Sequence, residues 1–123
     1  VRRAAESLNV RGEWVDVVGL EDLLRSHPKV LDVAVVGIPD PAEGKKLKAC
    51  VQPKEQEAIK PEEILDFCQG KIAHFMIPHY LELMDQLPRL GGTEKVAKAD
   101  LEQAGVTEKT WEREKEGYKI ERS

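Results

Sequence analysis

The chain has 123 residues, of which 41% are hydrophobic, 34% are charged and 5% are aromatic, and its formal net charge at pH 7 is −4. This length is enough for one domain with a hydrophobic core of its own, whereas the negative charge argues against nucleic acid as the main partner. The sequence has no run of about 18 apolar residues, so it predicts no membrane span. Its charges are interspersed rather than gathered into a patch for a membrane surface.

The two cysteines, Cys50 and Cys68, are not at CxxC spacing, and each lies in a segment with periodic apolar residues. We expect both to be small buried residues in a reducing, cytoplasmic compartment, with a disulfide between them as the other arrangement. The sequence starts with Val1 and has no signal-peptide pattern, so we expect it to be a piece of a longer polypeptide.

The first part of the chain predicts a hairpin, a helix and a strand. Apolar and polar residues alternate on both sides of Arg11-Gly12, which predicts a small β-hairpin that turns near these residues. Asp16 is suited to cap a helix over residues 19–26, where three leucines share one face. Residues 29–37 are apolar on both faces and predict a strand buried in the centre of a sheet. We expect a rigid, proline-rich turn at residues 38–41.

The second part predicts further strands and helices. Alternation at residues 46–52 predicts a half-buried strand antiparallel to the first. A second helix should begin at Pro61, carry Glu62 and Glu63 near the positive end of its dipole, and end before Pro78. The remaining expected elements are a strand at residues 80–84, a helix at residues 96–104 stopped by Gly105, and a short helix around Trp111 that Thr107 caps and that ends at Gly117.

These elements predict an α+β fold, in which a small central sheet of about three strands is flanked by helices and preceded by an N-terminal β-hairpin. We expect residues 1–123 to form a single domain. Within it, residues 1–15 would be the hinge and hairpin, and residues 16–123 would be the α+β body.

The stretch of residues 86–98 differs from these scaffold elements, because it combines Gly91-Gly92 with Lys95 directly before a helix. Glycine loses the most backbone freedom on folding and rarely helps a core. A loop that can move and that carries a cation is suited to contact a phosphate or a carboxylate. From the loop alone, an ordinary solvated lysine at a helix start is the simpler interpretation of Lys95.

The sequence contains no complete catalytic or metal site. His27, His74 and His79 have no carboxylate or cysteine at metal-ligand spacing, so we expect no metal site. The GxSxG motif is absent, and the glycine loop lacks the spacing and the Lys-Ser/Thr ending of a P-loop. The best candidate groups, Lys95 and Arg11-Gly12, both lie on loops, which favours a domain that contributes one or two groups to a site built mostly elsewhere.

Four stretches are similar to motifs of the C-terminal domain of adenylate-forming enzymes, the family of acyl-CoA synthetases, luciferases and peptide-synthetase adenylation domains. They are RAAESLNVRGEW (residues 3–14), EDLLRSHPKVLDVAVVGIPD (21–40), IAHFMIPHYLELMDQLP (72–88) and TEKV (93–96). The second is the most specific, since it is close to the family pattern E-x-x-L-x-x-H-P-x-V-x-x-A-A-V-V-G-x-P-D. The tail GVTEKTWEREKEGYKIER further resembles the branch with carnitine- and crotonobetaine-CoA ligase-like proteins.

The resemblance implies an ATP-dependent acyl-CoA ligase that works in two half-reactions. A carboxylic acid first attacks the α-phosphate of ATP to give an acyl-adenylate and pyrophosphate, and the thiol of CoA then displaces AMP. The lysine that matches Lys95, on a loop with Thr93 and Glu94, would serve the first step by offsetting charge at the phosphate. ATP, CoA and Mg²⁺ would bind mainly through the N-terminal AMP-binding domain of the same polypeptide, so we expect the isolated chain to be inactive.

For the second half-reaction, the resemblance implies that the small domain swings about a hinge, which falls on Ala5 and Glu6. The hairpin residues Arg11 and Gly12 would then face the pantetheine arm of CoA, since glycine lets a ligand pass close to the backbone. One domain would thus present two faces in turn.

The sequence departs from the family pattern at several positions, and these departures leave open a divergent or impaired ligase. Ala5 stands where the family has a hinge acid or lysine, Gly19 stands where it has an acid, and the loop before Lys95 is one residue longer. His74, Met76 and His79 stand where it has basic residues near the third strand. Ala5, Gly19 and the longer loop favour the alternative of a non-catalytic interaction domain that keeps the fold. A third possibility is a free-standing CoA-binding module, for which we expect no useful CoA affinity in this chain alone.

Overall fold

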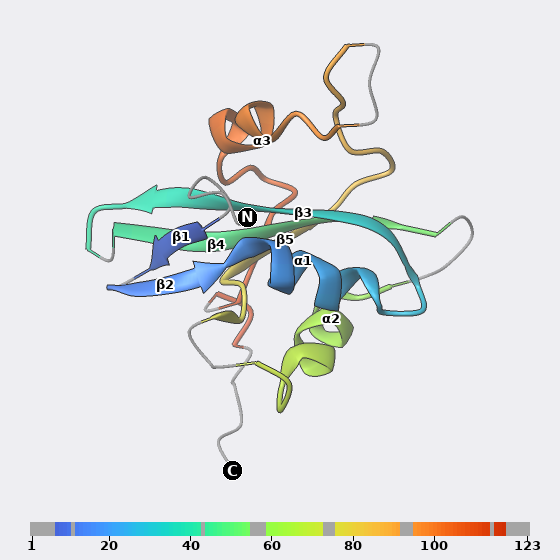
Figure 1. Cartoon of the computed structure of the whole chain (residues 1–123), viewed down its shortest axis with the longest axis horizontal. Coiled ribbons are helices and arrows are strands. Elements are labelled where there is room, and N and C mark those ends of the chain that lie inside the picture. Colours follow the sequence, from blue (N-terminus) through green and yellow to red (C-terminus); the bar gives the residue numbers. More distant parts are fainter. Residues whose placement is uncertain are drawn as a thin grey trace.

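The computed structural model describes residues 7–10, 12–42, 44–54, 59–72, 76–91, 95–113 and 115–117 (Figure 1). Its elements in chain order are β1 (Ser7–Val10), β2 (Glu13–Asp16), α1 (Val17–Arg25), β3 (Val30–Asp40), β4 (Gly44–Pro53), α2 (Pro61–Cys68), β5 (Tyr80–Leu83), α3 (Lys98–Ala104) and β6 (Trp111–Glu112). The mixed α+β class predicted from the sequence is confirmed. None of the helices in the described ranges is long and apolar enough to cross a membrane.

The N-terminal hairpin is present. β1 and β2 pair antiparallel, with Ser7 opposite Asp16 at one end and Val10 opposite Glu13 at the other. Gly12 adopts a positive φ of 84° in the turn, a conformation that costs glycine little. The backbone N–H of Gly12 donates to Oδ1 of Asn9 at 3.1 Å, which closes the turn. The predicted hairpin and its turning point are therefore confirmed.

The main sheet has four strands in the order β3-β4-β5-β6, one more than the sequence predicted. β3 pairs antiparallel with β4, β4 pairs parallel with β5, and β5 pairs antiparallel with β6. The fourth strand is formed by the segment around Trp111, where we predicted a short helix. That prediction is wrong because Trp111 pairs with Leu81 of β5 and the N–H of Arg113 donates to the His79 carbonyl at 2.9 Å.

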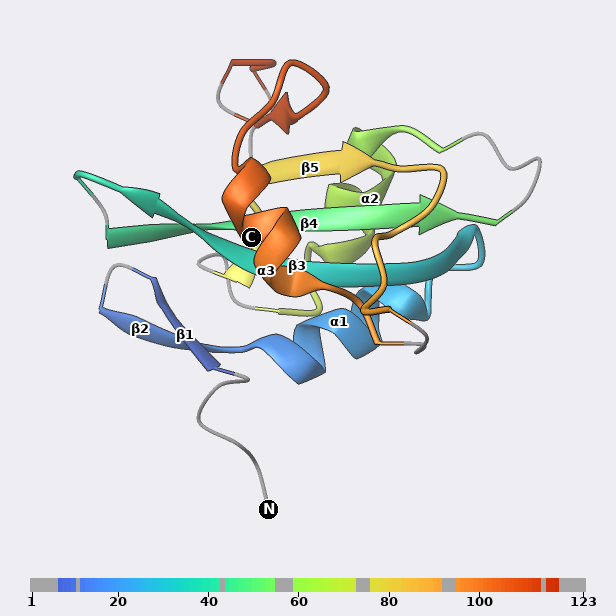
Figure 2. The same ribbon diagram turned by 90° about the horizontal axis from the view of Figure 1, so that it is seen from above.

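The two faces of the sheet are covered by different elements (Figures 1 and 2). The hairpin, α1 and α2 lie on one face, and their apolar side chains form the larger core with Val33, Val35 and Leu81 of the sheet. α3 lies on the other face, where Leu101 packs with Val36 and Cys50 in a smaller core. Successive residues of β3 therefore enter different cores, which confirms that this strand is buried on both faces. The predicted position in the centre of the sheet is wrong, because β3 pairs only with β4 and forms an edge of the four-stranded sheet.

The prediction that the second strand is half-buried is wrong. Leu47, Ala49 and Val51 of β4 face the larger core, but Lys48 and Cys50 are also buried, with exposed fractions of 1% and 0%. α3 and the segment after it cover this second face. The alternating pattern identified the strand and missed its covering, because Lys48 has the composition of an exposed position.

Several element ends differ from the sequence predictions. β3 continues through Pro39 to Asp40, where we expected a turn, because an edge strand tolerates a residue without an N–H. α2 ends at Cys68, before Pro78 as predicted, and its end coincides with an extended Gln69 and with a φ of 83° at Gly70. α1 begins at Val17, and the predicted cap is confirmed because Oδ1 of Asp16 accepts from the N–H of Gly19 at 3.1 Å.

Candidate functional site

Lys95 is exposed and lies on the segment between β5 and α3. We call residues 88–97 the lysine loop; its residues 92–94, which include Thr93 and Glu94, lie outside the described residues. Its two arms are joined by an antiparallel bridge between Arg89 and Val96. The N–H of Leu90 donates to the Lys95 carbonyl at 2.9 Å, and the N–H of Ala97 donates to the Pro88 carbonyl at 2.8 Å. The backbone of Lys95 is thus part of the ladder that fixes the base of the loop.

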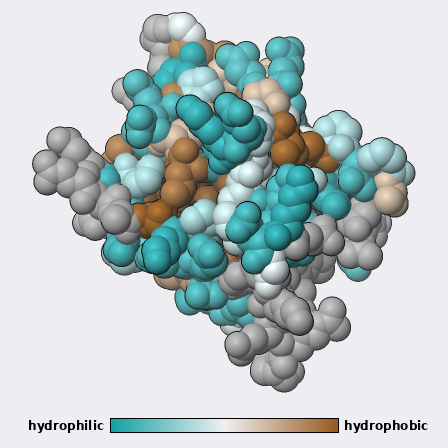
Figure 3. Space-filling view, turned by 180° about the vertical axis from the view of Figure 1, so that it is seen from behind, coloured by the Kyte–Doolittle hydropathy of each residue, from teal (hydrophilic) through white to brown (hydrophobic). Residues whose placement is uncertain are grey.

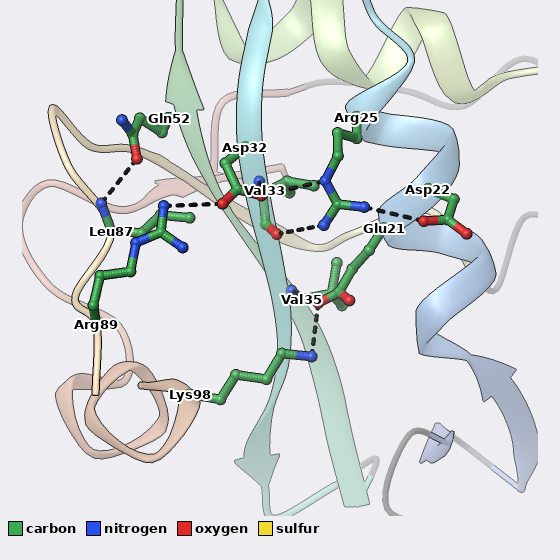
Figure 4. A network of polar contacts seen from close by, with 10 residues as sticks. All are labelled: Glu21, Asp22, Arg25, Asp32, Val33, Val35, Gln52, Leu87, Arg89 and Lys98. Carbon is green, nitrogen blue, oxygen red and sulfur yellow. Dashed lines mark hydrogen bonds and ion pairs between the residues drawn. The ribbon is translucent and has the colours of Figure 1, made fainter. Parts of the chain in front are cut away.

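The first arm of the lysine loop is anchored to β3 by Arg89 (Figure 4). Nη2 of Arg89 lies 3.0 Å from Oδ2 of Asp32, and both side chains are largely covered, with exposed fractions of 28% and 22%. The other oxygen, Oδ1 of Asp32, accepts from Nε of Arg25 at 3.2 Å and from the N–H of Val33 at 2.8 Å. Burial raises the pKa of Asp32, but the hydrogen bonds from Val33, Arg89 and Arg25 outweigh it and hold the pKa below its usual value.

The second arm of the lysine loop is anchored to α1 by Lys98, the first residue of α3. Nζ of Lys98 lies 2.7 Å from Oε2 of Glu21. The same carboxylate oxygen accepts from the N–H of Val35 at 2.8 Å, so Glu21 also occupies a backbone donor on the outer edge of β3. In Figure 4, Arg89 and Lys98 approach β3 from one side, and Glu21 and Arg25 approach it from α1 on the other.

The segment that leads into the lysine loop is fixed to the sheet. Leu87 is buried in the smaller core, and its N–H donates to Oε1 of Gln52 on β4 at 3.2 Å. Sequence reasoning identified Lys95 and missed its supporting residues Glu21, Asp32, Arg89 and Lys98. Opposite charges in the sequence were the only signal for these pairs, and such charges are too common to identify partners as distant as Asp32 and Arg89, which are 57 positions apart.

The second candidate region, the hairpin turn, is held firmly by the strands on either side. Gly12 is exposed, whereas Val10 and Val15 are buried in the larger core. A Cβ atom at Gly37 of β3 would lie only 3.3 Å from Cδ1 of Leu8, so glycine at that position lets the hairpin approach the sheet closely. Trp14 of β2 is 69% exposed and extends the accessible surface beside the turn.

The hairpin turn and the lysine loop are well separated in both Figures 1 and 2: the turn lies at one end of the long axis, and the loop projects from the side of the sheet that α3 covers. Figure 3 shows the face behind that of Figure 1, where hydrophilic side chains separate smaller hydrophobic areas.

Five of the residues predicted for the site lie outside the described residues: Ala5, Glu6, Arg11, Thr93 and Glu94. Their roles stay predictions. The position of His74 is likewise not described.

Two of the histidines, His27 and His79, contact other groups within the domain. Nδ1 of His27 accepts from the N–H of Lys29 at 3.1 Å, and its ring packs edge-on against Phe67 at a centroid distance of 4.9 Å. Nε2 of His79 lies 3.0 Å from Nη2 of Arg113, whose Nη1 donates to the Ile77 carbonyl at 3.2 Å. Across the part of the chain that the structure describes, no group of three His, Cys, Asp or Glu residues could hold a metal ion.

Comparison with known proteins gives consistent matches. A family model described as "AMP-binding enzyme C-terminal domain" matches residues 19–94. The chain is 40% identical over 88 residues to a mitochondrial medium-chain acyl-CoA ligase, ACSF2, of Bos taurus, an alignment that covers 72% of this chain and 14% of the ligase. It is 39% identical over 89 residues to a crotonobetaine/carnitine–CoA ligase of Escherichia fergusonii, covering 72% of this chain and 17% of that protein.

The fold is also similar to solved structures. One is the ATP-bound crystal structure of MatB from Rhodopseudomonas palustris, with a TM-score of 0.77 and 25% identity. The similarity covers 95% of this chain and 21% of MatB. The chain thus spans between about one seventh and one fifth of the lengths of these three proteins.

Proposed function

Because the chain belongs to the family of AMP-binding enzyme C-terminal domains, we propose that it is the mobile C-terminal domain of an ATP-dependent acyl-CoA ligase and that Lys95 serves its adenylation step. The observation that carries the proposal is the placement of Lys95, which is exposed on a loop whose two arms are fixed to β3 and α1. A cation held out from a rigid base can enter a site formed by another domain.

The first half-reaction brings two anions together. A carboxylate oxygen attacks the α-phosphorus of ATP, the bond from that phosphorus to the bridging oxygen breaks, and pyrophosphate leaves with the electron pair. An ammonium group near the reacting phosphate offsets the negative charge on its oxygens where water is excluded. Lysine suits this task because it is a compact charge on a flexible stem, and Lys95 would supply it.

The second half-reaction requires a different face of the domain. The CoA thiolate attacks the carbonyl carbon of the acyl-adenylate, and AMP leaves. The hairpin turn, which lies far from the lysine loop in both views, would then line the pantetheine path, with Arg11 and Gly12 as the residues proposed for this role. A rotation about a hinge at Ala5 and Glu6 would exchange the two faces, with residues 16–123 moving as the body of the domain.

The partners under this proposal are the preceding AMP-binding domain, a carboxylic acid, ATP and CoA. We assign Mg²⁺ to ATP and the preceding domain and derive no step from it. The two relatives are named for different acids, so the proposal extends to a carboxylic acid as a class. Without the preceding domain, the chain should be inactive. A cytoplasmic location stays a prediction.

The test is Lys95→Ala in the full-length enzyme, with Lys54→Ala as the matched control, since Lys54 is also an exposed lysine and lies outside the loop. We expect the rate of adenylation, measured by pyrophosphate exchange, to fall more than tenfold. A tenfold loss corresponds to about 1.4 kcal/mol of transition-state stabilisation. The control should stay within twofold of the unmodified enzyme. If the exchange rate of Lys95→Ala stays within tenfold of that of the unmodified enzyme, Lys95 is not the adenylation lysine.

The alternative is a domain that keeps the fold for interaction alone. It is favoured by Gly19, where the family has an acid, and by the 69% exposure of Trp14. The same experiment separates the two functions, because an interaction domain predicts equal exchange rates for the Lys95 and Lys54 variants.

A further inference from the structure

We propose that the ion pair between Arg89 and Asp32 positions the lysine loop for the adenylation step, which makes Arg89 a positioning residue for Lys95. This inference rests on the function proposed above. It assigns to the pair a task beyond holding the domain together, namely fixing where the first arm of the loop stands relative to the sheet.

Arg89 and Lys95 lie opposite each other on the two arms of the lysine loop. Arg89 bridges to Val96, the residue directly after Lys95, and Leu90, the residue directly after Arg89, donates its N–H to the Lys95 carbonyl at 2.9 Å. A displacement of Arg89 is therefore transmitted through two backbone contacts to the residue that carries the ammonium group.

The carboxylate of Asp32, which accepts from Arg89, is held rigidly. Asp32 lies on β3, and its Oδ1 is already occupied by the N–H of Val33 at 2.8 Å and by Nε of Arg25 at 3.2 Å. Nη1 of Arg25 is held in turn by Asp22 of the same helix at 3.0 Å. The carboxylate is thus fixed from the sheet and from α1, which leaves Oδ2 aimed at Arg89. A charged acceptor fixed by several hydrogen bonds positions its partner more narrowly than a free surface carboxylate.

The fold does not depend on the Arg89–Asp32 ion pair alone. If Arg89 lost its charge, Leu87 would stay buried, Lys98 would keep its contact with Glu21, and the backbone ladder at the base of the loop would remain. The loop would stay attached and gain freedom in its first arm. A misplacement of roughly 1 Å at a reacting group can cost about 100-fold in rate, so such freedom should slow adenylation without unfolding the domain.

The test uses the full-length enzyme with Arg89→Met, which removes the charge and keeps most of the length. Lys29→Met is the matched control, because it breaks a comparably exposed ion pair with Glu63 (3.3 Å) away from the lysine loop. Two rates are measured: pyrophosphate exchange, and thioester formation from CoA and acyl-adenylate that is supplied ready-made. We expect Arg89→Met to lower the maximal exchange rate at least fivefold, with the KM for ATP within twofold and thioester formation within twofold. The control should leave both rates within twofold.

Two further variants keep the test decisive if Arg89→Met folds poorly. Arg89→Lys, which retains a cation, should recover at least half of the lost exchange rate, and Asp32→Asn should reproduce the selective loss while still accepting from Val33. If Lys95→Ala abolishes exchange but Arg89→Met leaves it within twofold, the positioning role is wrong and the proposed function stands. An equal loss in both half-reactions would assign Arg89 to folding alone. If Lys95→Ala itself has no effect, the proposed function fails first.

Discussion

Nζ of Lys48 lies 2.9 Å from Oε1 of Glu82, and the two side chains, on the parallel strands β4 and β5, are 1% and 9% exposed. The same ammonium donates to the Gly105 carbonyl at 2.6 Å, and the hydroxyls of Thr107 and Thr110 donate to Oε1 of Glu82 at 3.2 and 3.0 Å. This buried pair therefore ties the chain after α3 to the middle of the sheet.

Removing one partner of this pair should strongly destabilise the domain. Lys48→Met leaves the Glu82 carboxylate buried without its cation, and such a loss costs about 3–5 kcal/mol. We expect the free energy of unfolding in urea to fall by about that amount. Lys115→Met is the control, because it removes an exposed pair with Glu112 and should change stability by less than about 1 kcal/mol. Similar losses in the two variants would contradict the structural role of the buried pair.

Asp16 should contribute to stability through the helix cap. Its Oδ1 accepts from the N–H of Gly19, one of the four N–H groups at the start of α1 that have no partner within the helix. Asp16→Ala should lower the free energy of unfolding by about 1 kcal/mol, whereas Asp16→Asn, which keeps an acceptor, should cost clearly less. Urea unfolding of both variants measures the difference, and equal costs would exclude the cap as the cause.

His27 should make the stability of the domain fall as the pH drops below about 6.5. Burial lowers its pKa, with the Glu63 carboxylate opposing and the Lys29 ammonium adding to the effect. The unfolded chain, with a pKa of about 6.5, therefore binds protons before the folded chain does, so the free energy of unfolding falls as the pH drops below that value. Protonation would also remove the acceptor at Nδ1 that holds the N–H of Lys29.

The measurement for His27 is urea unfolding at pH 7 and at pH 5.5. His27→Asn keeps an acceptor and does not titrate, so its stability should change less over this interval than that of the unmodified chain. Asp32 and Glu82, whose pKa values are also lowered, lose their contributions only at lower pH, as they become protonated. An unchanged pH dependence in His27→Asn would assign the effect to other groups.

The two thiols should be unreactive in the folded protein. Burial raises the pKa of Cys50 and of Cys68 to about 11, and both are free cysteines. Since the thiolate is the reactive form, we expect iodoacetamide at pH 7.5 to label neither in the native chain and both in urea, as read by mass spectrometry. Rapid labelling of either thiol without denaturant would show that its core opens easily.

Short-range patterns predicted much of the fold. The hairpin turn at Gly12, the Asp16 cap and the doubly buried strand β3 each depend on residues that are close in sequence, and all three are confirmed. The motifs around residues 21–40 and 93–96 identified the family because they extend over consecutive positions. The region of Lys95 could be chosen for the same reason, as a glycine-containing loop before a helix.

Long-range packing decided the rest. Trp111 forms an edge strand instead of a helix because the exposed backbone of β5 offers it partners, and Lys48 is buried because α3 returns over the second face of the sheet. The support of Lys95 by Arg89 and Asp32 likewise depends on two segments that meet only in the folded chain. The sequence by itself thus determined the local elements and the family, whose signals are short-range. Only the tertiary structure decided which charges pair and which strand edges are filled, since those free energies arise when distant segments come into contact.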